Sequence, residues 1–555
     1  MKIVVSIILS TFIFTGVFSQ DYGWHLGDAE DNSSIGISAR SLYSGILKDM
    51  PSKTVIVAVI DSGVDAEHED LAENMWINHD EIPGNGIDDD SNGYVDDIHG
   101  WNFIGGPGGN VHHDTYEATR IYGKYKYKFD NAVPGKLSKK DKELYEKYLK
   151  CKEEVEEKKS KAQLSLTNIE KTESVYLNSL DAIDEVLEDR EINLENLKMI
   201  DGSEDRFVGI GKNMLLDLIS RGKDDIDIDT LKSIIKELNQ AEKEIHQVKV
   251  DYAYNPDFDS RKIIGDNYND PTERYYGNND VEGPDASHGT HVAGIIAAVR
   301  DNNLGMDGVS DNVRIMSVRA VPDGDERDKD VANAIRYAVD NGAAIINMSF
   351  GKGYSWNESI VEEAIKYAEK HDVLLVHAAG NDNKNNDETD NFPNDEYQGK
   401  GFLFFKGKQK FFNNWLEIGA LSYEKGKFAA ANFSNFGETE VDLFAPGMAI
   451  YSTIPDNGYT FLQGTSMAAP VVAGVAAILR SYFPSLTAVQ VREILMTTVT
   501  VINEEVFIPG SYSDMTAFSK LCVSNGVVNA EKAVKKAMVT KGKKKIKKKE
   551  QNTRA

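Results

Sequence analysis

Cysteine is nearly absent from this chain: its 555 residues include only Cys151 and Cys522. Two cysteines cannot build the multi-bridge framework that holds small secreted domains together. One disulfide and two free thiols both remain open, because the spacing of the pair favours neither. The fold must therefore depend on its hydrophobic core, with bound metal ions as additional cross-links.

Positive charge is also scarce. The chain has 62 Lys and Arg residues against 89 Asp and Glu residues, a formal net charge of −27. Such a chain repels phosphate, so we expect no nucleic acid partner. The exception is the tail at residues 541–555, in which lysine dominates. We interpret this tail as a disordered, solvated end, and a contact with an acidic surface is the alternative.

Long apolar runs are missing after the first twenty residues. Lys2 is followed by an almost wholly apolar run from Ile3 to Phe18. This pattern predicts a signal peptide at residues 1–19 and export to the periplasm or the extracellular space. An uncleaved membrane anchor is the alternative, but the run is short for a span. We expect no transmembrane segment in the mature chain. Residues 20–50 form a short N-terminal segment, too short for a globular propeptide.

Short β-branched runs alternate with amphipathic stretches, which is typical of βαβ units and a parallel sheet. The run from Val55 to Ile60 is apolar throughout, as in a strand buried on both faces. The sequence therefore predicts an α/β fold: a doubly wound parallel sheet with helices on both faces. The other expected strands are 314–320, 343–348, 373–378 and 416–421, and the expected helices between them are 330–341 and 358–371.

The stretch at residues 136–252 differs in texture, because it is highly charged and helical in pattern. Two apolar stripes could bury each other there as an antiparallel helical hairpin. We interpret the stretch as a long charged helical insertion, acting as a spacer or as a binding device. The first stripe repeats every seven residues (Tyr148, Val155, Ala162, Ile169, Tyr176 and Ile183), and the second follows a 3.6-residue period (Leu231, Ile234, Leu238, Ala241, Ile245 and Val248).

Three segments carry residues suited to catalysis. Asp61 ends the expected buried strand, at the carboxyl edge where parallel sheets place their sites. His288 lies in Ser-His-Gly-Thr-His-Val-Ala-Gly, at the start of a helix rich in small residues. Ser466 lies in Gly-Thr-Ser-Met-Ala-Ala-Pro and opens another such helix, whose N-terminus favours negative charge. A serine at this place is otherwise an ordinary N-cap.

Together these segments resemble the subtilisin-like serine proteases (subtilases), in which the same motifs occur in the order Asp, His, Ser. The resemblance covers roughly residues 55–114 and 285–537. It implies a serine endopeptidase with Asp61, His288 and Ser466 as catalytic triad and polypeptides as substrates. It also implies that the peptidase domain comprises residues 51–135 and 253–540.

Two further segments fit this family. In Ala-Ala-Gly-Asn, Asn381 matches the side-chain donor of the oxyanion hole. Ser349, Phe350 and Gly351 resemble the strand that pairs with the substrate backbone.

An acidic segment from Glu81 to Asp97 predicts a calcium site. Asp88, Asp90 and Asn92 stand at alternate positions before Gly93, like the opening of an EF-hand loop, although the closing Glu is absent. We assign Asp88, Asp90, Asn92 and Asp96 as calcium ligands, with a solvated acidic turn as the alternative. No organic cofactor is expected.

Two rival functions remain. His288 and His291 are spaced like a zinc pair, but no Glu stands between them as in the HExxH motif, and no third ligand is evident. A protease-like binding protein that has lost catalysis is the other rival, although all the triad residues are present.

Overall fold

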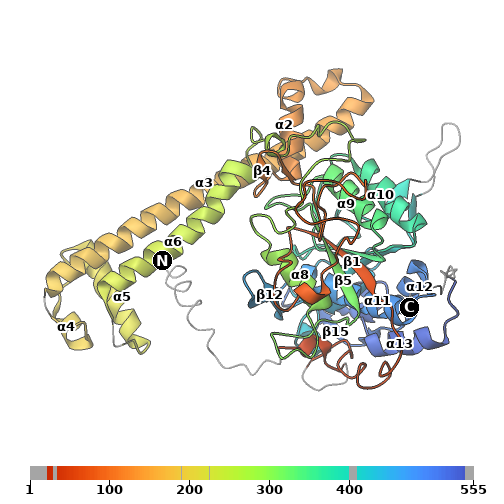
Figure 1. The fold of residues 1–555 in the computed structure, drawn as a ribbon. Coiled ribbons are helices and arrows are strands. Elements are labelled where there is room, and N and C mark those ends of the chain that lie inside the picture. Colours follow the sequence, from red (N-terminus) through yellow and green to blue (C-terminus); the bar gives the residue numbers. More distant parts are fainter. Residues whose placement is uncertain (1–21, 29–33, 189, 224–225, 399–408, 544–555) are drawn as a thin grey trace. The chain divides into compact units, whose positions relative to one another are not determined.

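The computed structural model describes residues 22–28, 34–188, 190–223, 226–398 and 409–543 (Figure 1). Its contacts divide the chain into a helical unit, Ala118–Phe258, and a sheet unit that contains Gln20–Glu117 and the chain from Asp259 onward. The predicted signal peptide at residues 1–19 and most of the basic tail lie outside the described residues.

The sheet unit is built on a nine-stranded sheet with the order β14-β17-β11-β10-β7-β6-β1-β5-β2. Neighbouring strands are parallel except at β14, which pairs antiparallel with β17. The five predicted strands are confirmed as β1 (Val55–Asp61), β5 (Val313–Arg319), β6 (Ile345–Met348), β7 (Leu374–Ala378) and β10 (Trp415–Leu421). The outer strands are β2 (Gly100–Asn102), β11 (Leu443–Pro446), β14 (Thr500–Val501) and β17 (Gly526–Val527).

Helices cover both faces of this sheet, which confirms the predicted α/β class. Along β1, Val55, Val57 and Val59 join one hydrophobic cluster, whereas Ala58 and Ile60 join another. Side chains of a strand alternate between faces, so the two clusters are the two sides of the sheet. Figure 1 shows α9 (Asp328–Asp340) and α10 (Glu358–Lys370) on one side and α11 (Thr465–Tyr482) and α13 (Ala530–Val539) on the other. The α11 side also receives α8 (Ser287–Ala297) and α12 (Ala488–Thr497).

One described helix, α11, is long and apolar enough to cross a membrane, although the sequence led us to expect none after residue 20. Of this helix, 89% is buried inside the protein. The central helix of an α/β core has the same composition, because it must pack against the sheet along its whole length.

Shorter elements complete the sheet unit. Its hairpins are β3 (Gly105–Gly106) with β4 (Gly109–Asn110), β8 (Glu396–Gln398) with β9 (Gln409–Phe411), β12 (Ile450–Ile454) with β13 (Gly458–Leu462), and β15 (Glu505–Phe507) with β16 (Met515–Ala517). Its short helices are η1 (Trp24–Leu26), η2 (Ala72–Asn74), α7 (Arg261–Ile264), η5 (Gly426–Phe428) and η6 (Phe518–Lys520).

The N-terminal segment is part of the core of the sheet unit. Trp24, Ile37 and Leu42 are buried in the same cluster as β1 and α11. The backbone oxygen of Ile37 also accepts a hydrogen bond of 2.7 Å from the nitrogen of Ala530 at the start of α13. The segment therefore contributes to the stability of this unit.

We predict that Leu42→Ala destabilises the sheet unit by about 2–5 kcal/mol, because it removes a buried side chain and leaves a cavity. The side chain is only 1% exposed. The matched control is Met538→Ala on α13, where the side chain is 56% exposed and the change should stay within about 0.5 kcal/mol. Thermal unfolding in a Ser466→Ala background, which prevents self-digestion, measures both. Equal melting temperatures for the two variants would show that the segment is not part of the core.

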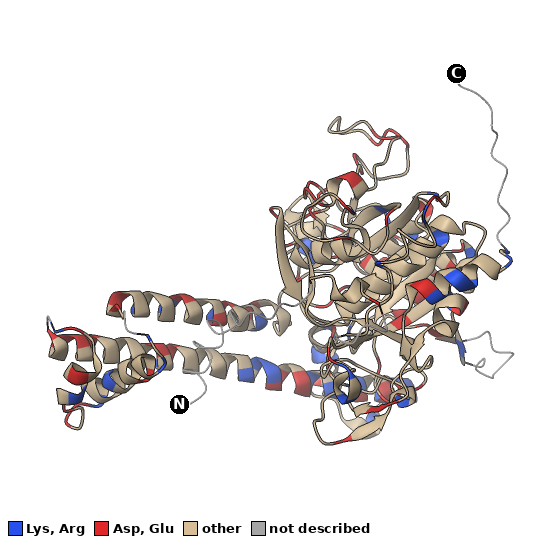
Figure 2. Cartoon of the chain, turned by 90° about the horizontal axis from the view of Figure 1, so that it is seen from below, with Lys and Arg blue, Asp and Glu red and all other residues tan. Residues whose placement is uncertain are grey.

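The helical unit contains the long helix α3 (Lys139–Leu187), which begins at the N-cap Ser138. All six residues of the first predicted stripe are buried on α3, so that prediction is confirmed. Figure 2 shows charges of both signs along α3, as expected for a solvated outer face. The other helices are α2 (Glu117–Phe129), α4 (Leu194–Met199), α5 (Arg206–Ser220) and α6 (Ile228–Val248), with the short turns η3 (Pro134–Lys136) and η4 (Lys249–Ala253).

Helices α3 and α6 run antiparallel. Lys232 lies 2.6 Å from Asp181, and Lys243 lies 2.7 Å from Glu173. Residue numbers therefore increase along α6 in the direction in which they decrease along α3.

The predicted stripe of α6 is only partly confirmed: Leu231 packs against the hydrophobic cluster of the helical unit, whereas Ile245 is exposed, and the buried residues of α6 are Ile228, Ile235 and Asn239. Helix α5 also packs on α3 and occupies part of its apolar surface. Helix α6 therefore buries a different face from the one that the predicted stripe marks.

Neither Cys151 nor Cys522 forms a disulfide in the structure, and both are buried. Cys151 lies on α3 of the helical unit and Cys522 lies in the sheet unit. Burial raises the pKa of the Cys522 thiol to about 11, so it stays protonated and unreactive at neutral pH.

Candidate active site

Asp61 and His288 meet at the carboxyl edge of the sheet. Asp61 is the last residue of β1 and is 2% exposed, and His288 is in the first turn of α8. The distance from Asp61 Oδ1 to His288 Nδ1 is 2.7 Å. The same oxygen accepts a hydrogen bond of 2.7 Å from the backbone nitrogen of Ser62, which fixes the carboxylate. The acceptor at Nδ1 requires a proton there, which leaves Nε2 of the neutral ring as the basic nitrogen.

Two opposing effects set the pKa of His288. Burial of the ring lowers the pKa, but the charge and the hydrogen bond of Asp61 outweigh burial. The pKa of His288 is therefore raised above the ordinary histidine value of about 6.5.

The second histidine of the motif has a structural place. His291 is fully buried, and its Nε2 faces the oxygens of Ile450 at 3.1 Å and Thr460 at 3.3 Å. A ring nitrogen that faces carbonyl oxygens must carry a proton and so cannot bind a metal. Burial, together with the nearby His288, lowers the pKa of His291 to about 4. His291 Nε2 is therefore not available to a zinc ion.

Ser466 is the second residue of α11 and is half-buried. Its Oγ donates a hydrogen bond of 3.1 Å to the backbone oxygen of Ser349, and its own backbone oxygen accepts one of 2.9 Å from Ser349 Oγ. Within the residues that the structure describes, no hydrogen bond joins His288 to Ser466. The structure thus links Asp61 to His288 directly, and Ser466 to the segment after β6.

Asn381 follows β7 and is tied to the residue before Ser466. Its Oδ1 accepts hydrogen bonds from Thr465, at 2.8 Å from the backbone nitrogen and 3.1 Å from Oγ1. Because a backbone N–H can only donate, the atom of Asn381 that faces it must be the oxygen, and the amide nitrogen Nδ2 points the other way. Thr465, which the sequence reasoning did not single out, thereby orients Asn381. Its position next to Ser466 in the motif was the available signal.

Two nitrogen donors lie near Gly464. A Cβ at Gly464 would lie 3.4 Å from Asn381 Nδ2, 3.5 Å from the backbone nitrogen of Ser466 and 3.6 Å from Asn381 Oδ1. Gly464 has φ of +154°, a value that other residues rarely adopt, so glycine keeps this space open. Donors arranged in this way can stabilise an oxygen that acquires negative charge.

The segment after β6 presents a free backbone edge. Ser349 is held by Ser466, and Lys352 exchanges backbone hydrogen bonds of 2.8 and 3.0 Å with Phe392. Between them, the backbone groups of Phe350 and Gly351 make no hydrogen bond to any part of the chain described here. An extended peptide can add its own hydrogen bonds to such an edge.

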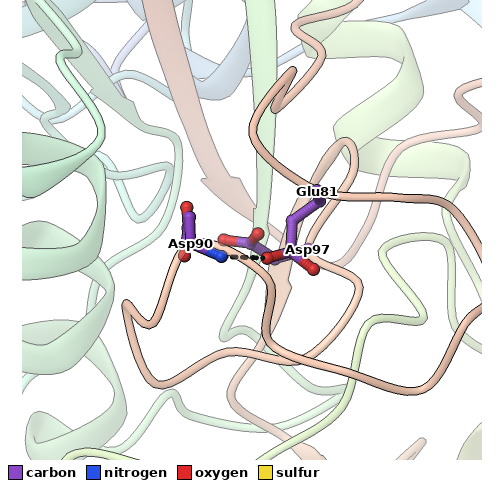
Figure 3. A group of neighbouring side chains, drawn as sticks. All are labelled: Glu81, Asp90 and Asp97. Carbon is purple, nitrogen blue, oxygen red and sulfur yellow. Dashed lines mark hydrogen bonds between the residues drawn. The ribbon is translucent and has the colours of Figure 1, made fainter.

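The acidic segment gathers carboxylates, but not the predicted set. Oxygens of Glu81, Asp90 and Asp97 lie within 4.8 Å of one another, and Figure 3 shows their side chains together. Of the four predicted ligands, only Asp90 belongs to this group. Asp88 instead accepts hydrogen bonds from the nitrogens of residues 92 and 93, and Asp96 accepts from those of residues 85 and 86. Asn92 Nδ2 donates to Asp90 and Asp97 and so borders the group.

Glu81 and Asp97 were missed because the EF-hand spacing drew attention to the middle of the segment. They are its first and last residues, brought together by the turn between them. Asp97 is fully buried, and burial raises its pKa to about 6. No Lys or Arg forms an ion pair with any of the three carboxylates in the described chain. An all-oxygen set without a compensating cation fits a hard divalent ion such as calcium.

The sheet unit is a doubly wound α/β fold in which a buried aspartate orients a histidine and a serine opens the central helix. This is the arrangement that the sequence resemblance led us to expect. The sequence model of the subtilase family matches residues 52–510. The chain therefore belongs to the subtilase family.

The relatives named here each align over less than half of this chain. The thermophilic serine proteinase of Bacillus sp. (strain AK1) is 37% identical over 46% of this chain and 55% of its own length. Subtilisin DY of Bacillus licheniformis is 34% identical over 40% of this chain and 73% of its own length. The cell wall-associated protease of Bacillus subtilis (strain 168) is 34% identical over 42% of this chain, and the alignment spans 23% of that relative.

Proposed function

We propose that this protein is an exported serine endopeptidase that hydrolyses peptide bonds with Asp61, His288 and Ser466. The observation that carries the proposal is the 2.7 Å hydrogen bond from His288 Nδ1 to Asp61 Oδ1, which makes Nε2 the available base. Membership of the subtilase family supports the same activity. The apolar leader at residues 1–19 supports export to the periplasm or the extracellular space.

In this mechanism, Ser466 Oγ attacks the carbonyl carbon of the substrate while His288 Nε2 accepts the hydroxyl proton. The C–N bond breaks when His288 returns that proton to the leaving amine. Asp61 holds the ring in one tautomer and stabilises the imidazolium that forms. Ser466 Oγ donates to the backbone oxygen of Ser349 in the structure, so the hydroxyl must leave that hydrogen bond before it can give its proton to His288.

The oxyanion of the tetrahedral intermediate would receive hydrogen bonds from Asn381 Nδ2 and the backbone nitrogen of Ser466. Both donors lie near Gly464, and Thr465 holds Asn381 in place before the substrate arrives. We assign Ser349, Phe350 and Gly351 to substrate binding. The unpaired backbone of Phe350 and Gly351 supports this role, since it offers a peptide an edge with which to pair.

Cleavage of an internally quenched peptide library by the purified protein tests this function. We expect internal peptide bonds to be cut, and we expect a fluorophosphonate, which reacts with an activated serine, to stop the reaction. His288→Ala should stop cleavage as well. A protein that binds peptides and cuts none would support the alternative of a binding protein that has lost catalysis.

The activity should fall in acid as His288 becomes protonated, because only the neutral ring can act as a base. Asp61 raises the pKa of His288, so protonation begins at a higher pH than for an ordinary histidine. We therefore expect the acid limb of kcat/KM to have its midpoint above about pH 6.5. Initial rates between pH 5 and 9 measure it, and activity that is constant across this range would exclude His288 as the base.

We further propose that Glu81, Asp90 and Asp97 hold a calcium ion that stabilises the sheet unit. The lack of a basic partner and the burial of Asp97 support a cation between them. The ion would neutralise their mutual repulsion and fix the turn at residues 81–97.

Removal of calcium should lower the melting temperature. At calcium concentrations about 100 times Kd, binding contributes about 2.7 kcal/mol, which corresponds to a shift of about 3 °C for a unit of this size. Asp90→Asn should remove most of this dependence. Asp88→Asn is the control, since Asp88 bonds only to backbone nitrogens and lies outside the group. If a chelator does not change the melting temperature of the wild type, the proposed calcium site is wrong.

We propose that residues 136–252 are an insertion in a peptidase domain formed by residues 51–135 and 253–540. The helical unit supports this division, because it has its own hydrophobic cluster around Leu180 and Leu215. The mixed charges of α3 support a solvated spacer.

A further inference from the structure

A buried lysine follows the free backbone edge of the candidate active site. The Lys352 side chain is 1% exposed. Its Nζ lies 2.7 Å from Glu117 Oε2, 2.7 Å from Asp328 Oδ1 and 2.7 Å from the backbone oxygen of Glu326. The cavity beside it has about 20 Å³, which is room for one water molecule. The amine is therefore held in one position.

The partners of Lys352 come from segments far apart in the sequence. Asp328 and Glu326 stand at the start of α9, after β5, whereas Lys352 stands after β6. Glu117 is the last residue of the sheet unit before the helical unit begins. One amine thus ties the segment after β6 to the segment after β5 and to Glu117, all within the sheet unit.

The carboxylate of Asp328 in this cluster is charged. Burial raises the pKa of Asp328, but the charge of Lys352 together with hydrogen bonds from Asn357, Lys352 and Ser355 outweighs burial and holds the pKa below its ordinary value. Asp328 Oδ2 also accepts a hydrogen bond of 2.8 Å from Ser355 Oγ, so the same carboxylate holds the chain on the far side of Lys352. A buried ion cluster is weak evidence for stability, because desolvation of the charges opposes their attraction. The contribution of this ion cluster is to hold the segments that it joins in fixed positions.

We propose that Lys352 is a positioning residue that fixes the Phe350–Gly351 edge in the extended form that pairs with a peptide substrate. The edge has no backbone hydrogen bonds of its own within the described chain, and Ser349 anchors only its other end. This role rests on the proposed function. It predicts a loss for substrates long enough to lie along the edge, and a smaller loss for a substrate that is too short to reach it.

The test compares an internally quenched octapeptide with a single-residue thioester on the wild type and on Lys352→Met. We expect KM for the octapeptide to rise about tenfold, as the loss of one or two backbone hydrogen bonds would produce. The kcat/KM for the octapeptide should fall at least about fivefold more than that for the thioester. Losses of equal size for both substrates, or no loss for the octapeptide, would overturn the positioning role.

Glu117→Gln gives a second test that does not depend on how well Lys352→Met folds. It keeps a hydrogen-bonding side chain and removes one charge, so we expect a selective octapeptide loss of about two- to threefold. An unchanged ratio of the two substrates in Glu117→Gln counts against the proposal. Lys520→Met removes the exposed pair with Glu438 and should leave both substrates unchanged.

The experiment distinguishes a failure of the proposed function from a failure of the positioning role. If the wild type hydrolyses neither substrate and a fluorophosphonate does not label it, the proposed function fails. If the wild type hydrolyses both substrates and Lys352→Met lowers kcat/KM for both by the same factor, only the positioning role is wrong.

Discussion

Ser466→Ala is expected to reduce kcat for peptide hydrolysis by about 10⁶-fold, the size of the loss found for the nucleophile of subtilisin. The hydroxyl is the only part of this side chain that can form the acyl-enzyme. Removal of Oγ costs one hydrogen bond to Ser349, while Ser349 Oγ still donates to the backbone oxygen of residue 466. The variant should therefore fold normally. Initial rates on the octapeptide and circular dichroism spectra measure the two properties.

Ser359→Ala is the matched control for this substitution. Ser359 lies at the start of α10 and is exposed, with its Oγ bonded only to Asn357. We expect its activity to stay within about twofold of the wild type, since surface changes of this kind have small effects. Substantial peptide hydrolysis by purified Ser466→Ala would require another nucleophile.

Asp61→Asn is expected to reduce kcat by about 10⁴-fold, the usual loss for this change in a Ser-His-Asp triad. Asparagine can keep an oxygen opposite Ser62 and His288, so the fold is retained, but the negative charge that stabilises the imidazolium is lost. Asp61 is also the main cause of the raised pKa of His288. The residual activity should therefore persist to lower pH than wild-type activity does, and rates between pH 5 and 9 test both effects.

Asp285 provides the comparison. It also raises the pKa of His288, but through space and from an exposed position. Asp285→Asn should change kcat less than about threefold and shift the acid limb slightly downward. Similar losses in the two variants would indicate a general effect of negative charge near His288, without a specific role for Asp61.

The strands of the sheet could be predicted from the sequence because each has apolar residues on both faces, as strands buried on both sides require. Val55–Asp61 is the clearest case, and Asp61 marks its end by the change from apolar to acidic. The positions of Asp61 and His288 at one edge followed from the parallel topology and from the family resemblance. Their hydrogen bond required the structure.

Features that depend on the packing of distant segments could not be predicted. The buried face of α6 is set by α5 as well as α3, so Ile235 and Asn239 are buried although the predicted stripe does not include them. Glu81 and Asp97 approach each other only because the turn between them closes. Nothing in the sequence marks Lys352, because its partners Glu117 and Asp328 lie in other segments of the chain.

The most direct test of the central claim is to map where a fluorophosphonate attaches. After reaction at pH 8 and proteolytic digestion, mass spectrometry should find the label on the peptide that contains Ser466 and on no other serine. Labelling should be lost in His288→Ala and slowed in Asp61→Asn, because both residues activate the hydroxyl. A label on a different serine, or the same labelling rate in His288→Ala, would contradict the triad.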